Sequence, residues 1–302
     1  MSEKARGIKT YVTAEEAARL LPIRRRDSHK GTYGKAAIVA GSAEYTGAAY
    51  LSVAACLRSG VGYTTLFAPK GILRSYYGKE PEALLRSLGW GKRLKVSKKE
   101  FRELLSYDSI AYGMGLGVSR QVYKGVAYLL THYEGKLILD ADGLNSLAKY
   151  GKDWKGLFAR KKCDVLLTPH GREFSRLSKK SVEEVLKNGD TLATNFAREY
   201  GVVVLLKNSV SAIANGNEVV WNQTGNSGQA KGGSGDVLSG VLAGLCATGL
   251  SAFDAAKVGA YLTGRAAELA ALETEEYSML ARDLISYLPA SFLEVSRIQT
   301  GG

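Results

Sequence analysis

The chain has 302 residues, of which 45% are hydrophobic and 23% charged, and its formal net charge is +12. This composition is typical of a globular protein and excludes a disordered or low-complexity chain. Its lysines and arginines are scattered, mostly in pairs, and do not alternate with aromatic residues, so we expect no nucleic-acid partner. The three cysteines are dispersed, the first residues form no signal peptide, and no apolar run is long enough to span a membrane, so we expect a cytoplasmic protein without membrane contact.

Taken in chain order, the apolar runs predict strands that alternate with helices. A short amphipathic helix over residues 14–21 ends at Pro22, and the loop that follows leads into the first strand. The expected strands cover residues 35–42, 62–69, 109–117, 136–142, 164–170 and 202–208, and two short strands over 211–222 form a hairpin around Asn215-Gly216. The expected helices cover residues 47–60, 119–133, 181–200 with a break near Gly189, 236–248 and 251–273.

The predicted strands are almost continuously apolar, which is typical of parallel strands covered by helices on both faces. We therefore expect an α/β fold with a mostly parallel central sheet, helices on both faces and a late antiparallel hairpin. Nothing in the chain resembles a linker or a repeat. We expect residues 29–302 to form a single domain, preceded by residues 1–28 as an N-terminal extension that carries the short helix.

Glycines and polar residues directly follow most of the predicted strands. In open α/β sheets, ligands bind beyond the carboxyl ends of the strands, so this distribution predicts a binding site at that edge. The residues concerned are Gly41, Ser42, Gly113, Gly115, Gly117, Asp140, Asp142, Thr168, His170, Glu173, Lys207 and Asn208.

The segment KGGSGD, Lys231–Asp236, places three glycines before or at the start of a predicted helix. Such glycines allow several backbone N–H groups to face one anion at the positive end of a helix, which favours phosphate binding. The alternative is a tight turn in which Asp236 caps the helix. Next to an anion site, Asp236 is also suited to act as a general base that takes a proton from a substrate hydroxyl as a phosphoryl group arrives.

Five other polar positions each keep two interpretations. His170 is a candidate catalytic group or a structural histidine, and Glu173 is a candidate ligand of Mg²⁺ or a residue that supports a helix start. Asp140 and Asp142 suit a metal-bridged phosphate, or one of them caps the next helix. Lys207 is either an exposed lysine at the end of a strand or a contact of a nucleotide.

Six sequence blocks carry a family resemblance: HKGTYGKAAIVAGSAEYTGAAYLSVAACLRSGVGYTTL, AYGMGLG, LDADGLNSL, LLTPHGREFSRL, VVVLLKNSVSAI and GNSGQAKGGSGDVLSGVLAGL. In this order they resemble the ADP/ATP-dependent NAD(P)H-hydrate dehydratases of the ribokinase-like superfamily. The resemblance implies a ribokinase-like fold and dehydration of the S epimer of hydrated NADH or NADPH (NADHX or NADPHX), by phosphorylation of the ring hydroxyl and elimination of phosphate. It further implies ADP or ATP as co-substrate, Mg²⁺ as cofactor, a homo-oligomer, and functional pairing with a separate NAD(P)HX epimerase.

The resemblance also implies roles for individual residues. Asp236 is the expected catalytic base, and Glu173 is the expected residue on the metal side. The hydrate-binding positions fall on Ala48, Gly115, His170 and Asp236, and the nucleotide-binding positions on Lys207, Asn208, Ser209, Val210, Ser211, Gly233, Ser234 and Gly235.

This chain departs from the family pattern at two places. It reads TPHGRE, with Gly171-Arg172, where the family usually has TPHPGE, and it has Asn208 where the family usually has glycine. Both departures concern the nucleotide side, so the choice between ADP and ATP stays open. The alternative function is a small-molecule kinase of the same superfamily, of the vitamin-precursor type, because a glycine-rich anion site and an aspartate base suit both reactions.

Overall fold

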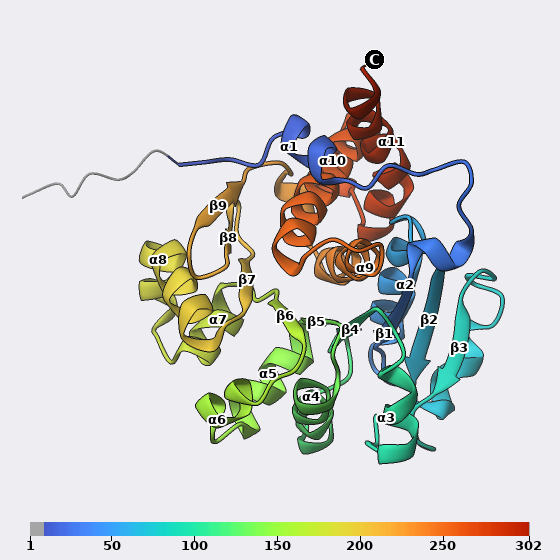
Figure 1. Ribbon diagram of the computed structural model, residues 1–302, viewed down its shortest axis with the longest axis vertical. Coiled ribbons are helices and arrows are strands. Elements are labelled where there is room, and N and C mark those ends of the chain that lie inside the picture. The colour runs from blue at the N-terminus through green and yellow to red at the C-terminus, as the bar shows by residue number, and fades with distance from the viewer. Residues whose placement is uncertain (1–8, 302) are drawn as a thin grey trace, which may run out of the picture.

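In the computed structural model, which describes residues 9–301, a nine-stranded sheet runs through the molecule (Figure 1). The strand order is β3-β2-β1-β4-β5-β6-β7-β8-β9, and all pairings from β3 to β7 are parallel. The strands are β1 (Lys35–Val39), β2 (Tyr63–Ala68), β3 (Leu84–Ser87), β4 (Ser109–Tyr112), β5 (Lys136–Leu139), β6 (Asp164–Leu167), β7 (Val203–Leu206), β8 (Ser211–Ala214) and β9 (Val219–Asn222).

The central strands are buried along most of their length because helices cover the sheet on both faces. β1, for example, is exposed at Lys35 and buried at its next four residues. Most observed strands end earlier than predicted, because the polar and glycine residues after them already turn toward the site. The late antiparallel hairpin is confirmed: β8 pairs antiparallel with β9, and Gly216 takes a φ of 91° in the turn between them.

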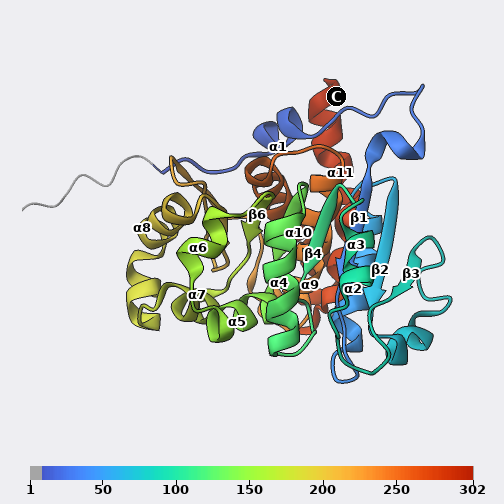
Figure 2. The same ribbon diagram turned by 60° about the horizontal axis from the view of Figure 1, so that its bottom comes forward.

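Five helices cover one face of the sheet, and they include α1 and α11, the first and last helices of the described chain (Figures 1 and 2). Within this layer α2 and α9 pack at unusually close range, since a Cβ atom added to Gly240 would lie 2.1 Å from the carbonyl oxygen of Ser52. A Cβ atom added to Gly244 would lie 2.5 Å from the Cβ atom of Ser59. The helices are α1 (Ala14–Leu20), α2 (Thr46–Leu57), α9 (Ser234–Ala247), α10 (Ala252–Ser278) and α11 (Ala281–Thr300).

The other face carries six helices, which lie nearest the viewer in Figure 2. The predicted break in the helix around Gly189 is confirmed, because Asn188 has non-helical angles. These helices are α3 (Lys98–Leu104), α4 (Arg120–His132), α5 (Ala141–Tyr150), α6 (Trp154–Ala159), α7 (Gly171–Ser178) and α8 (Val182–Tyr200). Three short 3₁₀ helices connect other elements: η1 (Lys30–Tyr33), η2 (Lys70–Tyr76) and η3 (Ser227–Gln229).

Several observed elements have no counterpart among the predicted ones, among them β3, α3, α6 and α11. β3 is short and mostly exposed at the edge of the sheet, so its sequence lacks the apolar run that marks the other strands. α11 continues through Pro289, a residue that normally ends a helix. Its buried side chains, among them Leu284, Leu288 and Val295, pack in the same layer as α10.

The described part of the N-terminal extension packs onto the far edge of the sheet. The N–H of Val12 donates to the carbonyl of Trp221 in β9, and the N–H of Trp221 donates to that of Thr10, both at 2.9 Å. The ammonium of Lys257 in α10 lies 3.0 Å from the carboxylate of Glu16 in α1. Across residues 9–301, no helix combines the length and the apolarity that crossing a bilayer would need.

Candidate active site

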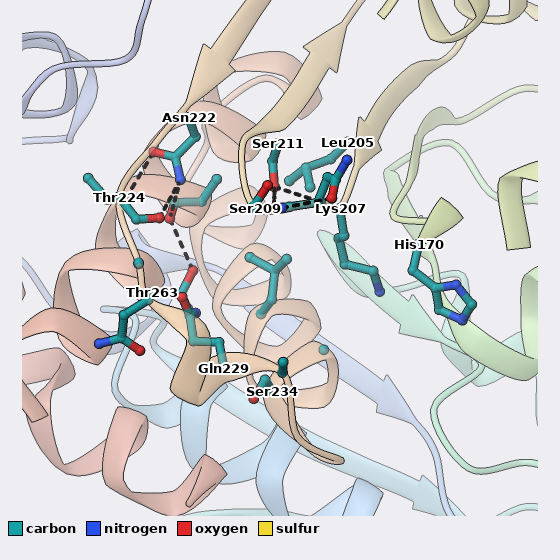
Figure 3. A pocket seen from close by; sticks show the side chains of 18 of the residues that line it. His170, Leu205, Lys207, Ser209, Ser211, Asn222, Thr224, Gln229, Ser234 and Thr263 are labelled. Carbon is teal, nitrogen blue, oxygen red and sulfur yellow. Dashed lines mark hydrogen bonds between the residues drawn. The ribbon is translucent and has the colours of Figure 1, made fainter. Parts of the chain in front are cut away.

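A cavity of about 790 Å³ opens beyond the carboxyl end of β7. Figure 3 shows that its walls come from the Lys207–Ser211 segment, the end of β9, the glycine-rich loop before α9, and one side of α10. The cavity therefore lies at the edge of the sheet that the sequence indicates. Seven predicted nucleotide or substrate residues line it: His170, Lys207, Asn208, Ser209, Ser211, Ser234 and Gly235.

The remaining predicted residues lie outside the cavity wall. Val210 points away and is 39% exposed, although its neighbours on both sides line the cavity. Gly233 shapes the loop, with a φ of 102° that a residue with a side chain would adopt only under strain. Ala48, Gly115, Glu173 and Asp236 do not line the cavity, and their roles stay predictions.

The sequence did not indicate the deeper wall of the cavity. A buried amide and a hydroxyl are joined there, because the Thr224 hydroxyl donates to Asn222 Oδ1 at 3.0 Å. The run NQTGN over residues 222–226 carried a signal, since polar residues and a glycine follow a strand directly. The small residues of α10 carried none, because they look like ordinary helix packing. The residues missed include Asn222, Thr224, Asn226, Gln229, Thr263 and Gly264.

The glycine-rich loop ends two residues earlier than predicted. α9 starts at Ser234, with Gly233 at the N-cap, so Asp236 is the third helical residue and does not cap the helix. The alternative in which Asp236 is the N-cap is therefore wrong. In a helix start of this kind the N–H groups of Gly235 and Asp236 have no acceptor within the helix, and they lie at the positive end of its dipole. The loop thus meets the cavity with free backbone donors.

The positive charge of Lys231 would suit a bound anion, but its ammonium is bonded to the backbone. Its ammonium donates to the carbonyls of Tyr277 and Met279, each at 2.7 Å. These bonds tie the glycine-rich loop to the end of α10. Two of the three ammonium donors are therefore committed to the protein.

The carboxylate of Asp236 is partly buried and makes no hydrogen bond to any of residues 9–301. Burial raises its pKa to about 7, and the negative charges of Asp140 and Asp142 add to the increase, while Lys207 opposes it. A carboxylate with a pKa close to neutrality, and without a protein partner, is suited to accept a proton from a substrate.

Asp140 joins α9 to the wall of the cavity through two contacts. Its Oδ1 lies 2.8 Å from the ammonium of Lys207, which lines the cavity, and its Oδ2 accepts from the Ser239 hydroxyl at 2.8 Å. Asp140 stands at the N-cap position of α5, but its side chain makes no capping bond, and its role toward a metal-bridged phosphate stays a prediction. Burial alone would lower the pKa of Lys207, but the charges of Asp140 and Glu173 outweigh that effect and raise it.

His170 occupies the N-cap of α7 as a half-exposed side chain. Its Nδ1 accepts from the N–H groups of Arg172 and Glu173, which leaves Nε2 as the protonated nitrogen of a neutral ring. Burial lowers the pKa of His170, although the charge of Glu173 opposes this. The ring is therefore a neutral hydrogen-bond donor at the rim of the cavity.

Ala48 and Gly115 are brought into contact at the start of α2. A Cβ atom on Gly115 would lie 2.9 Å from the Cβ of Ala48, so any larger residue would fill the space between them. The next turn of α2 reaches the glycine-rich loop, because a Cβ atom on Gly233 would lie 2.6 Å from Leu51. The N–H of Gly117 donates to Asp142 at 2.8 Å, which links this corner to the carboxylates around Asp236.

The donor set around the cavity does not form a cage for a metal ion. No group of three His, Cys, Asp or Glu side chains within residues 9–301 is arranged to hold one. Both oxygens of Glu173 accept hydrogen bonds, from the N–H of His170 at 3.0 Å and from Asn145 at 3.4 Å. Mg²⁺ commonly takes only one or two carboxylates and fills its shell with water and phosphate. These residues thus fit an ion that arrives with nucleotide phosphates, and the metal role of Glu173 stays a prediction.

Comparison with known proteins agrees with this geometry. The family model described as NAD(P)H-hydrate dehydratase matches residues 36–290. A bifunctional NAD(P)H-hydrate repair enzyme of Thermofilum pendens is 36% identical over 274 residues, which are 89% of this chain and 52% of the relative. The chain thus spans about half the length of this relative.

Two proteins of similar length complete the comparison. The Bacillus subtilis ADP-dependent (S)-NAD(P)H-hydrate dehydratase is 33% identical over 92% of this chain and 96% of its own. The crystal structure of the Bacillus subtilis ADP/ATP-dependent NAD(P)H-hydrate dehydratase with ATP/Mg²⁺ superposes with a TM-score of 0.81 and 31% identity, over 95% of this chain and 99% of that one. A ribokinase-like superfamily protein of Enterococcus faecalis, 24% identical, shares the fold with a TM-score of 0.79, over 98% of this chain and 99% of its own. The predicted fold is confirmed, and the chain belongs to the NAD(P)H-hydrate dehydratase family.

Proposed function

We propose that the protein dehydrates the S epimer of hydrated NADH and NADPH back to the reduced dinucleotide, with ADP or ATP as phosphoryl donor. The observation that carries this proposal is the carboxylate of Asp236, which has no hydrogen-bond partner among residues 9–301 and has its pKa raised to about 7. It lies one residue from Gly235, which lines the nucleotide cavity. Its helix packs against α2, which carries Ala48.

The proposed reaction has two steps. Asp236 takes the proton of the ring hydroxyl while the hydroxyl oxygen bonds to the terminal phosphorus of the nucleotide, whose bond to the bridging oxygen breaks. The bond between the ring carbon and the phosphorylated oxygen then breaks, driven by the lone pair of the ring nitrogen, and phosphate leaves. The C5 proton is lost as the double bond forms, which yields the dihydronicotinamide, phosphate and the shortened nucleotide.

The residues on the cavity side stabilise the charge that moves. The free N–H groups at the start of α9 and the ammonium of Lys207 face the site that we assign to the phosphates. His170, as a neutral donor, is placed to bond the nicotinamide side of the hydrate. Mg²⁺ bound to the phosphates would neutralise part of their charge. We propose homo-oligomers and cooperation with an NAD(P)HX epimerase on the family resemblance alone.

The test is an absorbance assay for reduced nicotinamide with purified protein, S-hydrate, Mg²⁺, and ADP or ATP in parallel. We expect the band to return in a nucleotide-dependent way, with one phosphate released per dinucleotide. The rate should rise with pH through about 7, because Asp236 must lose its proton before it can act as a base. No recovery with either nucleotide would falsify the dehydratase proposal.

The alternative is a small-molecule kinase of the same fold, which the aspartate base and the anion site also suit. The products separate the two reactions. A kinase leaves a stable phosphate ester and releases no free phosphate, whereas the dehydratase releases phosphate and reduced dinucleotide together.

A further inference from the structure

We propose that Asp140 is a positioning residue for this reaction: it holds the ammonium of Lys207 on the cavity side and so leaves the carboxylate of Asp236 free to act as the base. The inference rests on the proposed function for its catalytic consequence, but its structural part stands on the contacts of Asp140. Lys207 has three carboxylates within electrostatic range, those of Asp140, Glu173 and Asp236, and it forms an ion pair with Asp140.

The contacts of Asp140 fix both ends of this arrangement. Its side chain is 2% exposed, and its two oxygens bind different elements: Lys207 after β7 and Ser239 in α9, each at 2.8 Å. Ser239 lies three residues after Asp236 in α9, so Asp140 is bonded to the helix that carries the base. Within residues 9–301, no N–O contact of 4.0 Å or less joins Lys207 to Asp236.

The backbone around Asp140 is strained in a way that favours this placement. Ala141 has a φ of 46°, which lies in the left-handed region that a residue with a side chain rarely adopts. Opposite it, a Cβ atom on Gly113 would lie 2.0 Å from the carbonyl oxygen of Asp140, so β4 approaches closely. The strained turn after β5 sends Asp140 toward Lys207 and α9, while Asp142 contacts the N–H of Gly117. Such strain persists where the surrounding structure enforces it, commonly at functional sites.

The charged groups around Asp236 and Lys207 together determine how the pKa of Asp236 should change when Asp140 loses its charge. Asp140 and Asp142, from the turn after β5 and the start of α5, raise its pKa, and Lys207, after β7, lowers it. Glu173 and His170, from the start of α7, act on Lys207. If Asp140 lost its charge, the ammonium of Lys207 would lose its ion-pair partner while other carboxylates remain nearby. Both oxygens of Glu173 already accept hydrogen bonds, so we expect Lys207 to form an ion pair with Asp236, which would occupy the base.

The experiment follows the carboxyl carbon of Asp236 by ¹³C NMR during a pH titration, with Asp236→Asn used for assignment. In Asp140→Asn we expect the midpoint to fall by at least about 1 pH unit, because a cation close to a carboxylate lowers its pKa by about 1–3 units. The kcat at pH 7.5 should fall at least about 10-fold, since a base paired with lysine is weaker and less accessible. A wild-type protein without dehydratase activity would contradict the proposed function. The NMR midpoint of Asp236 tests the positioning role independently of that result.

Asp142→Asn is the matched control, because it removes a neighbouring carboxylate without freeing Lys207. We expect its midpoint to fall by less than half of the shift in Asp140→Asn. Equal shifts in the two variants, or an unchanged midpoint in Asp140→Asn, would overturn the positioning role.

A second comparison decides the matter should Asp140→Asn fail to fold. The double variant Asp140→Asn/Lys207→Gln leaves no unpaired charge of the buried pair, so it is the better tolerated of the two. If Asp140 acts by holding Lys207, the kcat of the double variant stays within about 2-fold of that of Lys207→Gln, as expected for two residues that act as a unit. A further loss of about 10-fold or more shows that Asp140 has an independent role and contradicts the proposal.

Discussion

At the scale of single residues, the site depends on a carboxylate that the protein leaves without a hydrogen bond. Folding buries Asp236 partly and surrounds it with two like charges, which is unfavourable for the ionised form. The same unfavourable environment gives the side chain the proton affinity that a base at neutral pH needs. If Asp236 is the base, as we propose, the fold gives up stability for function at this residue.

Replacing Asp236 by asparagine should separate the two effects. We expect kcat to fall about 10²–10⁴-fold, the usual contribution of a general base, with nucleotide affinity retained. The folded-state pKa of about 7 lies above the unfolded value, so protonation of Asp236 stabilises the fold at low pH, and this contribution is lost as pH rises through 7. Asp236→Asn should consequently be more stable than the wild type at pH 8, on the order of 1 kcal/mol or more, and similar to it near pH 3.

Thermal unfolding at the two pH values, with turnover and nucleotide binding measured on the same samples, checks this prediction. Glu218→Gln serves as a control, because it changes an exposed carboxylate in the β8–β9 turn. A variant of Asp236 that loses stability at pH 8, or keeps its turnover, would argue against the role of the base.

The sequence indicates the residues that face the cavity from strand ends, but not those that act through a partner. Lys207 and Gly235 follow recognisable patterns, a strand end and a glycine-rich helix start. The pairing of Lys207 with Asp140 joins residues 67 positions apart, and no local pattern reports it. Thr263 and Gly264 look like ordinary small residues of a packed helix, and only the fold turns them toward the cavity.

At the scale of elements, the contact between α2 and α9 sets the position of the base. Gly240 has no room for a side chain, because a Cβ atom would lie 2.1 Å from the backbone oxygen of Ser52. Backbone atoms cannot move aside as the end of a flexible side chain can. The two helices are therefore held at a separation that only glycine permits.

Gly240→Ala should push α9 away from α2. We expect a loss of stability of about 1–3 kcal/mol, typical of overpacking in a core, together with reduced turnover because Asp236 moves with its helix. Thermal denaturation and the absorbance assay measure the two effects. Gly232→Ala is the control, since a Cβ atom there has no neighbour within 4 Å, and its stability should stay near that of the wild type. Equal stability of the two variants would show that the contact is not constraining.

The predictability of the elements follows from their burial. The strands from β4 to β7 are apolar because helices cover both faces, and their sequences show it. β3 lies at an exposed edge, where this requirement is absent, so its sequence has no strand pattern. α11 contains Pro289, and its packing against α10 outweighs a local preference that would end the helix.

At the scale of the whole molecule, the chain closes one edge of the sheet with its own beginning. Residues 10–12 add a short bridged segment to β9, and α1 then packs against α10 and α11. The opposite edge, at β3, has no strand beyond it among residues 9–301. The two edges therefore differ in how well they are protected from pairing with other chains.

A chain that begins at residue 22 should show what this closure contributes. It loses the two hydrogen bonds to Trp221 and the ion pair between Glu16 and Lys257. We expect the melting temperature to fall by about 5 °C or more, with aggregation that increases with concentration. The KM for nucleotide should rise, because Asn222 follows Trp221 directly and lines the cavity.

Full-length protein with Thr10→Ala is the matched control, since Thr10 contributes its backbone carbonyl to the bridge and its side chain is exposed. It should melt with the wild type. A truncated chain that melts at the same temperature and keeps its KM would show that the edge is stable without this cover.

The close packing of α2 on α9 also determines which side of the proposed site can move when a reactant binds. Ala48 lies on one of these helices and Asp236 on the other, so the fold fixes the spacing between the hydrate contact and the base before any ligand arrives. The cavity that we propose for the phosphoryl donor is lined largely by the loop segments 207–211 and 223–233, and loops adjust more readily than packed helices. Under the proposed assignment, adaptation to nucleotides of different length would therefore fall to the donor side, while the spacing on the acceptor side stays set by packed helices.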